Sequence, residues 1–224
     1  ICVSHRKLII VTTDSSNHSI YFVPGLNRGL RVLEILGAAA EPMSLSNIAR
    51  AMDLSRSSTF RLLYTLRQLD FIKEAEQANT FTLGSRVLNL GFAYLNQQPI
   101  ISVARPHLAA LRDRTRVSVH LGVLEGRDVL YLDSHQARTG FVTSMMTGTR
   151  IGAYSAGIGW CLLTELSDSA LDEFCDGLDM QPFTKHTPTD PASLKVRVAQ
   201  ARRDGYVVSR GFREPNGSSV AVPV

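Results

Sequence analysis

The sequence predicts an α+β fold: an N-terminal winged helix-turn-helix, a linker helix, and a C-terminal antiparallel sheet flanked by helices. Two observations predict it. The stretch Ser44–Leu69 contains two apolar repeats at helical spacing with a short break between them. After Val117 the pattern changes to short strands separated by turn residues, with further helical repeats behind them. A chain of 224 residues is long enough for two domains of ordinary size.

We divide the chain into four segments. Residues 1–23 read as an N-terminal arm, either flexible or foreign to the fold, because they show no signal-peptide pattern and run into a polar stretch. Residues 24–84 form the winged helix-turn-helix domain, residues 85–98 the linker helix, and residues 99–224 the second domain. The last strand is interrupted at Val224, so we expect the C-terminal end of that domain to be missing.

Composition and charge narrow the class of protein. A hydrophobic content of 44% with 20% charged residues is typical of a folded globular chain. Basic and acidic residues nearly cancel between Leu26 and Ser85, so binding of nucleic acid must depend on where the charge lies. The second domain carries an acidic run that would repel DNA, and we expect it to bind something else. That run is Glu165, Asp168, Asp172, Glu173, Asp176 and Asp179.

The three cysteines form no CxxC pair, and no histidine pair has metal-ligand spacing. We therefore expect no metal site, no disulfide framework and a reducing cytoplasm. No run of 18 apolar residues is present, so we expect no membrane partner.

The first domain is expected to hold three helices and a hairpin. An apolar repeat predicts the first helix from Leu26 to about Gly37. Ser44 and Ser55 each precede a helical repeat, where a hydroxyl can accept a hydrogen bond from a first-turn N–H group. Two short alternating strands follow the third helix, at residues 71–74 and 80–83, and a hairpin in this position is a wing that can lie on the phosphate backbone.

The outer face of the third helix has arginines and hydroxyls and no acid before Asp70. A polyanion can therefore bind there, and double-stranded DNA is the partner we expect. The expected DNA-binding residues are Ser44, Ser55, Arg56, Ser57, Ser58, Thr59, Arg61, Tyr64 and Thr65.

The linker helix is apolar almost all the way round, which indicates burial on several sides. The same helix of a second copy would cover it and give a homodimer, although a tetramer or burial within its own chain stays open. A dimer implies a near-palindromic operator.

The second domain begins with a helix at Ile101–Thr115, with Val103, Leu108 and Leu111 inward. Two strands then meet at the turn Glu125–Arg127. The remaining expected elements are a strand at Phe141–Met146, helices at Ile158–Leu166, Ser169–Leu178 and Pro191–Asp204, and strands at Tyr206–Val208 and Ser219–Val224.

A small-molecule hydrolase is the alternative function. Ser155 or Ser219 with His120 and Asp133 supplies the residue types of a triad, but the GxSxG turn that exposes a nucleophile is absent. We expect no catalysis and no cofactor.

Six stretches in this order and spacing resemble the IclR-type transcriptional regulators of bacteria. They are LNRGLRVLEIL at 26–36, LSRSSTFRLLYTL at 54–66, SVHLGVLEGRDVLYLD at 118–133, GTRIGAYSAGIGWCLL at 148–163, RRDGY at 202–206 and SVAVPV at 219–224. The resemblance implies a DNA-binding regulator of a catabolic operon, a linker helix that dimerises, and a GAF-like domain that binds a small organic-acid effector. A purely structural second domain is the alternative.

The resemblance also implies where the effector binds. Small residues at 154–159 would let backbone N–H groups at a helix start face a carboxylate, and Ser219 would face the same cavity. The expected effector-binding residues are Met145, Ser155, Ala156, Gly157, Ile158, Trp160 and Ser219. Two stretches depart from the family pattern: Gly159–Cys161 replaces a Gly-Lys-Ala, and Gly211–Glu214 replaces an acidic pair.

Overall fold

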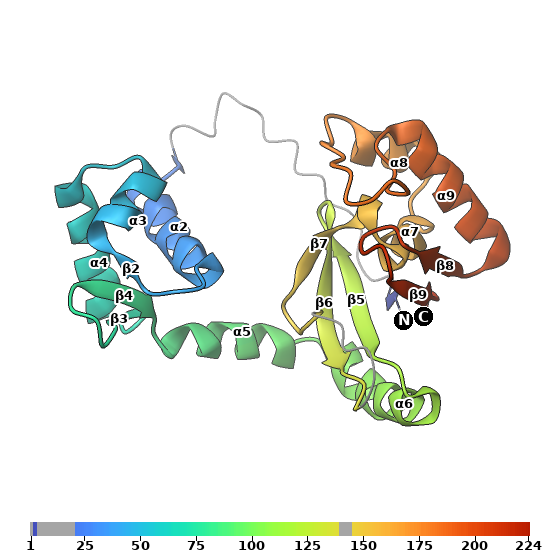
Figure 1. Ribbon diagram of the computed structural model, residues 1–224, viewed down its shortest axis with the longest axis horizontal. Helices are drawn as coiled ribbons and strands as arrows, with labels where there is room; N and C mark the ends of the chain where they lie inside the picture. Colours follow the sequence, from blue (N-terminus) through green and yellow to red (C-terminus); the bar gives the residue numbers. More distant parts are fainter. Residues whose placement is uncertain (1, 4–20, 139–144) are drawn as a thin grey trace. The chain divides into compact units, whose positions relative to one another are not determined.

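The computed structural model describes residues 2–3, 21–138 and 145–224 (Figure 1). The chain forms two compact units that divide after Gln97, and the N-terminal strand β1 (Cys2–Val3) belongs to the second of them. Strand β1 pairs in parallel with a strand of that unit, so this part of the expected N-terminal arm is held in a sheet. Residues 1 and 4–20 of the arm lie outside the described residues.

The first unit is a three-helix core with a small antiparallel sheet in the order β2-β4-β3. Its elements are α2 (Pro24–Ala38), β2 (Met43–Ser44), α3 (Leu45–Met52), α4 (Arg56–Gln68), β3 (Ile72–Glu74) and β4 (Thr80–Leu83). The hairpin of β3 and β4 directly follows α4, which confirms the predicted helix-turn-helix and its wing.

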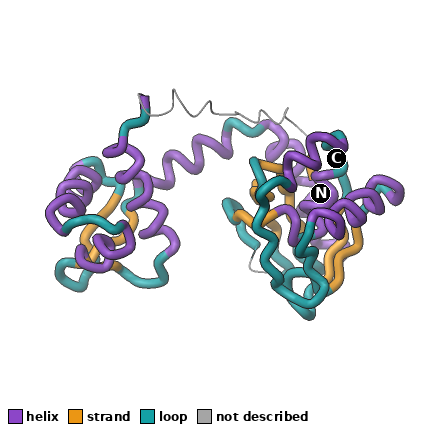
Figure 2. Tube along the Cα trace, turned by 90° about the horizontal axis from the view of Figure 1, so that it is seen from above, coloured by secondary structure: helices purple, strands orange, loops and turns teal. Residues whose placement is uncertain are grey.

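Apolar side chains from each helix and from the wing meet in the core of this unit. Val32 of α2, Ile48 of α3, Leu63 of α4 and Ile72 of β3 are all buried. Figure 2 shows the strands of the unit lying among its helices. The apolar repeats read from the sequence therefore fix which face of each helix points inward.

Both expected helix caps are present. The Ser44 hydroxyl accepts from the Asn47 N–H at 3.2 Å at the start of α3, and the Ser55 hydroxyl accepts from the Ser58 N–H at 3.2 Å at the start of α4. Each bond satisfies a first-turn donor that has no partner within its helix. The two serines thus fix the starting points of both helices of the motif.

The linker helix α5 (Arg86–Asn96) has no buried residue. The side chains of Leu88, Leu90 and Phe92 are 58–60% exposed. The unit that contains this helix therefore does not enclose these three side chains. Exposed apolar surface of this extent is typical of a contact surface, and its cover by a second copy stays a prediction.

The second unit is built on a four-stranded sheet in the order β1-β5-β6-β7. Helix α6 (Pro99–Thr115) leads into β5 (Val119–Glu125), β6 (Asp128–His135) and β7 (Arg150–Gly152). Strands β5 and β6 form the predicted hairpin, and Gly126 in its turn has a φ of 61°, where a side chain would be strained. On α6, Leu108 is buried as expected, but Val103 is 62% exposed, so its predicted inward position is wrong.

The third strand differs from the prediction. Residues 141–144 of the expected strand Phe141–Met146 lie outside the described residues, and Met145 and Met146 are not in a strand. The third antiparallel partner is β7, which pairs Ile151 with Val129 of β6. Strand β7 has only three residues, and its partner is distant in sequence, so local alternation gave no signal for it.

Helices and a second hairpin complete this unit. They are the 3₁₀ turn η1 (Ala153–Ser155), α7 (Gly157–Leu163), α8 (Asp168–Cys175), α9 (Pro191–Asp204), β8 (Val207–Arg210) and β9 (Ser218–Ala221). Helix α9 has the predicted bounds. Helices α7 and α8 are shorter at their C-terminal ends than expected: Ser167 caps the start of α8 soon after α7 ends, and α8 ends before Gly177, which has a φ of 61°. No helix in the described part of the chain has the length and hydrophobicity of a bilayer span.

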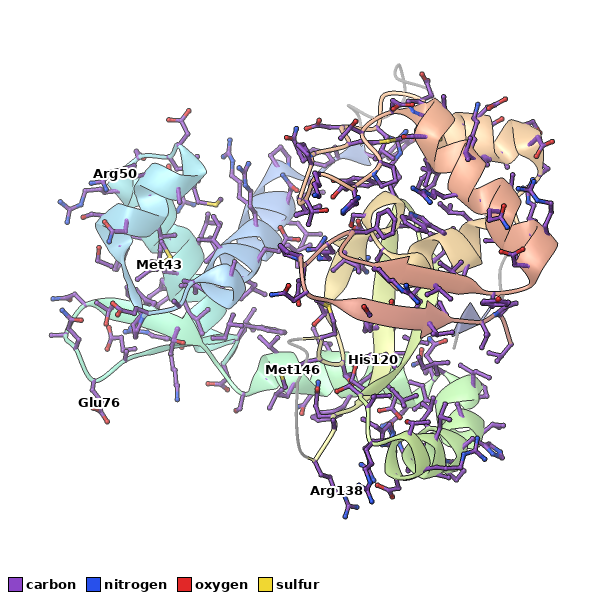
Figure 3. All side chains as sticks on the ribbon, turned by 45° about the vertical axis from the view of Figure 1, so that its right-hand side comes forward. Met43, Arg50, Glu76, His120, Arg138 and Met146 are labelled. Atoms are coloured by element: carbon purple, nitrogen blue, oxygen red, sulfur yellow. The ribbon has the colours of Figure 1, made fainter. Side chains whose placement is uncertain are left out.

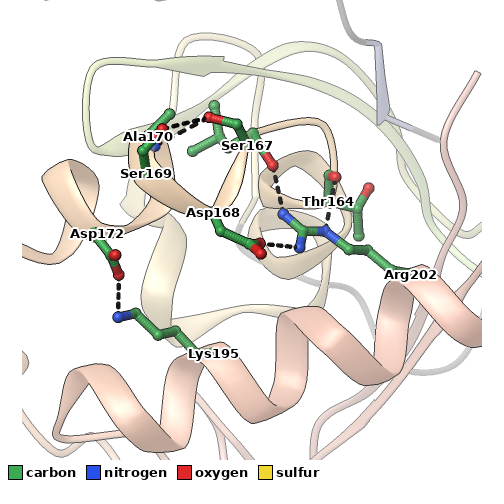
Figure 4. Close-up of polar contacts among 9 residues, drawn as sticks. Thr164, Ser167, Asp168, Ser169, Ala170, Asp172, Lys195 and Arg202 are labelled. Atoms are coloured by element: carbon green, nitrogen blue, oxygen red, sulfur yellow. Dashed lines mark hydrogen bonds and ion pairs between the residues drawn. The ribbon is translucent and has the colours of Figure 1, made fainter.

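Ion pairs join α8 to α9 (Figure 4). Arg202 of α9 contacts Asp168 at 2.7 Å and donates to the Thr164 carbonyl at 3.1 Å. Lys195 pairs with Asp172, and this bond raises the pKa of Lys195. The acidic run that was expected to repel DNA is therefore partly neutralised within its own unit.

Candidate nucleic-acid interface and effector site

The candidate nucleic-acid interface is the outer face of α4. Thr59 and Leu63 are buried on its inner face, and Leu62 and Leu66 are partly buried beside them. The residues on the other faces are exposed: Arg56, Ser57, Ser58, Phe60, Arg61, Tyr64, Thr65, Arg67 and Gln68. The helix contains no acidic residue. This face can accept a polyanion along its whole length.

Hydroxyl groups cluster at the start of α4. Ser55 Oγ lies 3.1 Å from Ser57 Oγ and 3.0 Å from Ser58 Oγ, while it caps the helix. All three serines are exposed. A helix N-terminus with free hydroxyls and backbone N–H groups favours phosphate oxygen atoms.

Thr59 was expected to bind DNA, and the structure contradicts this. Its side chain is fully buried, and its hydroxyl donates to the Ser55 carbonyl at 3.1 Å. Thr65 is exposed, but its hydroxyl donates to the Arg61 carbonyl at 3.0 Å. Ser44, the last residue of β2, caps the start of α3 with its hydroxyl. The β-branched hydroxyl residues thus satisfy the helix backbone, leaving the arginines and serines for a ligand.

Phe60 was missed by the sequence reading. It stands four residues from both Arg56 and Tyr64, and its side chain is 56% exposed. Its ring centroid lies 6.4 Å from that of Tyr64. Its exposure could have been predicted from the sequence, because Phe60 lies outside the apolar stripe that contains Leu63.

An ion pair joins the wing to α4: Arg67 of α4 contacts Glu74 of β3 at 2.9 Å. At the C-terminal end of α4, the Leu69 carbonyl accepts from Arg86, the first residue of α5, at 3.0 Å. Gly84 follows β4 and lies against the backbone of Asp70. Glycine is required there, because a Cβ would lie 2.2 Å from the Asp70 carbonyl oxygen. Figure 3 shows Glu76 pointing outward at the tip of the hairpin.

The candidate effector site centres on Ser155. This side chain is fully buried, donates to the Gly152 carbonyl at 2.8 Å and accepts from Arg213 Nη1 at 3.1 Å. The Arg213 guanidinium lies 4.3 Å from the centre of the Phe183 ring. Within the described residues, no carboxylate lies at ion-pair distance from Arg213. Among the described residues, Arg213 is therefore a cation without an acidic partner, held between Ser155 and the Phe183 ring.

Two more hydroxyls lie beside the start of α7. Ser209 of β8 and Ser219 of β9 occupy paired positions in the second hairpin. A Cβ on Gly157 would lie 2.9 Å from Ser209 Cβ and 3.6 Å from Ser219 Oγ. Ser219 therefore lies next to Gly157, and its expected place in an effector cavity stays a prediction. Ser209 was missed because only strand pairing brings it here.

The other expected effector residues are placed differently. Trp160 is 2% exposed, donates from its ring nitrogen to the Tyr154 carbonyl at 2.7 Å and packs edge-on against Phe212, so it is a core residue. Ala156 and Ile158 are half-buried. Met145 is half-buried, and its carbonyl accepts from the Gln136 side chain at 2.9 Å.

Two surface depressions were found elsewhere in the second unit. One of about 220 Å³ is lined by Cys161, Thr164, Glu165, Ala201, Arg202, Gly205 and Pro223. The other, of about 290 Å³, is lined by Arg112, Asp113, Arg116 and Arg138. Neither is lined by an expected effector residue. Among the described residues, no group of His, Cys, Asp or Glu side chains could hold a metal ion.

The residues of the hydrolase alternative do not form a triad. His120 Nδ1 lies 3.0 Å from Ser134 Oγ, and burial lowers the pKa of His120 to about 4. Asp133 contacts Arg105 at 3.1 Å and His135 at 3.3 Å. Ser155 is bonded to other groups, as described above, and Ser219 lies near Gly157.

Two family models match this chain. The model of the IclR helix-turn-helix domain matches residues 25–76, and that of the bacterial transcriptional regulator IclR C-terminal domain matches residues 92–224. The Pca regulon regulatory protein of Pseudomonas putida is 30% identical over 208 residues, which cover 91% of this chain and 69% of that protein.

Solved structures agree with the family models. A putative transcriptional regulator from Rhodococcus sp. RHA1 is 33% identical with a TM-score of 0.77, over 91% of this chain and 80% of that one. An IclR homolog from Microbacterium hydrocarbonoxydans, complexed with 4-hydroxybenzoate, is 25% identical with a TM-score of 0.77, over 89% of this chain and 82% of that one. The proteins named by these comparisons are regulators of transcription, not enzymes.

Proposed function

This chain belongs to the IclR family of bacterial transcriptional regulators, and from that premise we propose that it controls a catabolic operon in response to a small organic acid. It binds a near-palindromic operator as a homodimer, or as a tetramer made of two such dimers, in the cytoplasm. The observation that carries the DNA-binding part is the exposed, acid-free face of α4, held in position by its buried opposite face.

The docking mode follows from the helix geometry. The N-terminal half of α4 enters the major groove, where an arginine fork can bond guanine O6 and N7. Arg56 and Arg61 supply the forks, and the serine hydroxyls near Ser55 bond phosphate oxygens. The wing lies on the backbone beside them. In a dimer, two such helices read half-sites about one helical turn apart, and a footprint of a single asymmetric half-site would contradict that geometry.

Replacing Arg61 by alanine is expected to weaken operator binding by about 1–3 kcal/mol, because a bidentate contact to a guanine is lost. Fluorescence anisotropy with an operator selected from a random-sequence pool measures the change. Arg203→Ala is the matched control, since Arg203 is an exposed arginine of α9 in the other unit. Full operator affinity in the Arg61 variant would remove this residue from the interface.

The effector part of the proposal rests on Ser155 and Arg213. A carboxylate placed against the Arg213 guanidinium would supply the acidic partner that the described part of the chain does not, and the hydroxyls of Ser209 and Ser219 can donate to its oxygens. The arginine occupies the stretch where the family pattern has an acidic pair. The 4-hydroxybenzoate complex of the Microbacterium homolog makes aromatic carboxylates the first ligands to try.

Ser219→Ala and Arg213→Gln are each expected to weaken acid binding by about tenfold or more, because hydrogen bonds to charged groups contribute roughly 1.5–3 kcal/mol. A thermal-shift screen of small carboxylates, starting with 4-hydroxybenzoate, identifies a ligand, and calorimetry measures each variant. Ser218→Ala is the control. Consecutive residues of a strand point to opposite faces, so the Ser218 side chain points away from the face that carries Ser219.

Unchanged acid affinity in both variants would place the effector elsewhere. Operator binding by the free protein should survive both substitutions, because neither residue lies in the DNA-binding unit. A protein that binds its operator but no acid in the panel would favour a purely structural second unit.

A further inference from the structure

The outer face of α4 carries one large apolar side chain. Phe60 is 56% exposed on a face otherwise made of arginine, serine, threonine and glutamine side chains and the phenol of Tyr64. The tilted Tyr64 ring, with its centroid 6.4 Å away, supports Phe60 from one side. A single exposed aromatic residue on a monomer is ordinary, but this one lies in the middle of the proposed DNA-binding surface.

Phe60 is not a core residue of the unit. The buried positions of α4 on either side of it are Thr59 and Leu63, which are 0% and 1% exposed. Phe60 is absent from the buried cluster of the first unit, and among the described residues its ring contact is with Tyr64. Its position one turn after Arg56 and one turn before Tyr64 places it where base edges would pass in the major groove.

We infer that Phe60 recognises the C5-methyl group of a thymine in the operator, an inference that rests on the proposed DNA-binding function. Among the four bases, only thymine presents an apolar group in the major groove, and phenylalanine is a side chain suited to contact it. Arg56 and Arg61 on either side hold the helix against polar atoms. The aromatic ring then adds a preference for thymine at one position in each half-site.

The test removes only the methyl group. Each thymine of an operator selected from a random-sequence pool is replaced in turn by deoxyuridine, which keeps base pairing and lacks the methyl. The wild-type protein is expected to bind about fourfold more weakly when one particular thymine per half-site is changed, as expected for the loss of one buried methyl. For Phe60→Ala, the ratio of affinities for the thymine and deoxyuridine operators should fall to about one at that position.

Leu69→Ala is the matched control. Leu69 is another exposed apolar residue at the C-terminal end of α4, 45% exposed, and its removal should leave the thymine preference unchanged. The salt dependence of binding should also be the same in Phe60→Ala as in the wild type, because no phosphate contact is lost. Circular dichroism checks that both variants are folded.

The inference is overturned by a wild-type protein insensitive to every deoxyuridine substitution, or by a Phe60→Ala variant that keeps the full sensitivity. A change of oligomer mass in Phe60→Ala would instead assign the ring to a contact between subunits, which also overturns it. If no DNA sequence is selected from the pool at all, the proposed function itself fails. Selection of an operator without methyl sensitivity rejects the Phe60 inference alone.

Discussion

Replacing Leu88 or Phe92 on α5 by aspartate is expected to separate the assembled protein into monomers and to weaken operator binding by about 100-fold or more. Both side chains are more than half exposed on a helix with no buried residue. In a dimer that buries this surface, an aspartate would be a desolvated charge without a partner. Two half-sites bound by one dimer gain affinity through effective concentration, and a monomer loses that gain.

Light scattering after size-exclusion chromatography measures the mass, and anisotropy measures operator binding. Asn89→Asp is the control, because it adds the same charge to the same helix at an exposed position that is already polar. If both aspartate variants are folded and keep the wild-type mass, the surface of α5 is not the assembly contact.

Gly159→Ala is expected to destabilise the second unit by about 3 kcal/mol, at the upper end of the usual cost of overpacking. A Cβ at this position would lie 2.1 Å from the Ala153 carbonyl oxygen and 2.6 Å from two further backbone atoms of Ala153. Backbone cannot move aside as a flexible side chain would. Helix α7 would have to shift away from η1, although its side chains from Trp160 to Leu163 are all in the core.

Chemical denaturation followed by fluorescence of Trp160, the single tryptophan, reports on this unit. Gly29→Ala in α2 is the comparison, since nothing lies within 4 Å of a Cβ there, and alanine in place of a helical glycine should stabilise slightly. An unchanged denaturation midpoint in Gly159→Ala would show that α7 and η1 are not packed this closely.

The DNA-binding unit could be predicted well because its signals are local. A helix start needs a capping hydroxyl and an apolar repeat within a few residues, and Ser44 and Ser55 provide both. The hairpin around Gly126 is similarly a short-range pattern. In these cases, the residues that determine the element are its neighbours in sequence.

The site residues were predicted less well, since helical position alone does not say what a side chain contacts. Thr59 has a hydroxyl like the serines around it, yet it turns inward beside Leu63 and bonds the backbone. Phe60 is apolar, yet it stays outside. The burial of each depends on how α2 and α3 pack on α4. An apolar repeat predicts burial only for the residues that belong to the repeat.

The sequence by itself determined the two-domain organisation, the helix-turn-helix with its wing, and the family. Only the tertiary structure decided that β7 pairs with β6 beside the β5–β6 hairpin. It also decided that Arg213 reaches Ser155, 58 residues earlier in the chain. The same holds for Ser209 beside Gly157. Such contacts are made by pairing of strands and loops far apart in the chain, so their cause is the packing of the whole unit, and no short window of residues contains it.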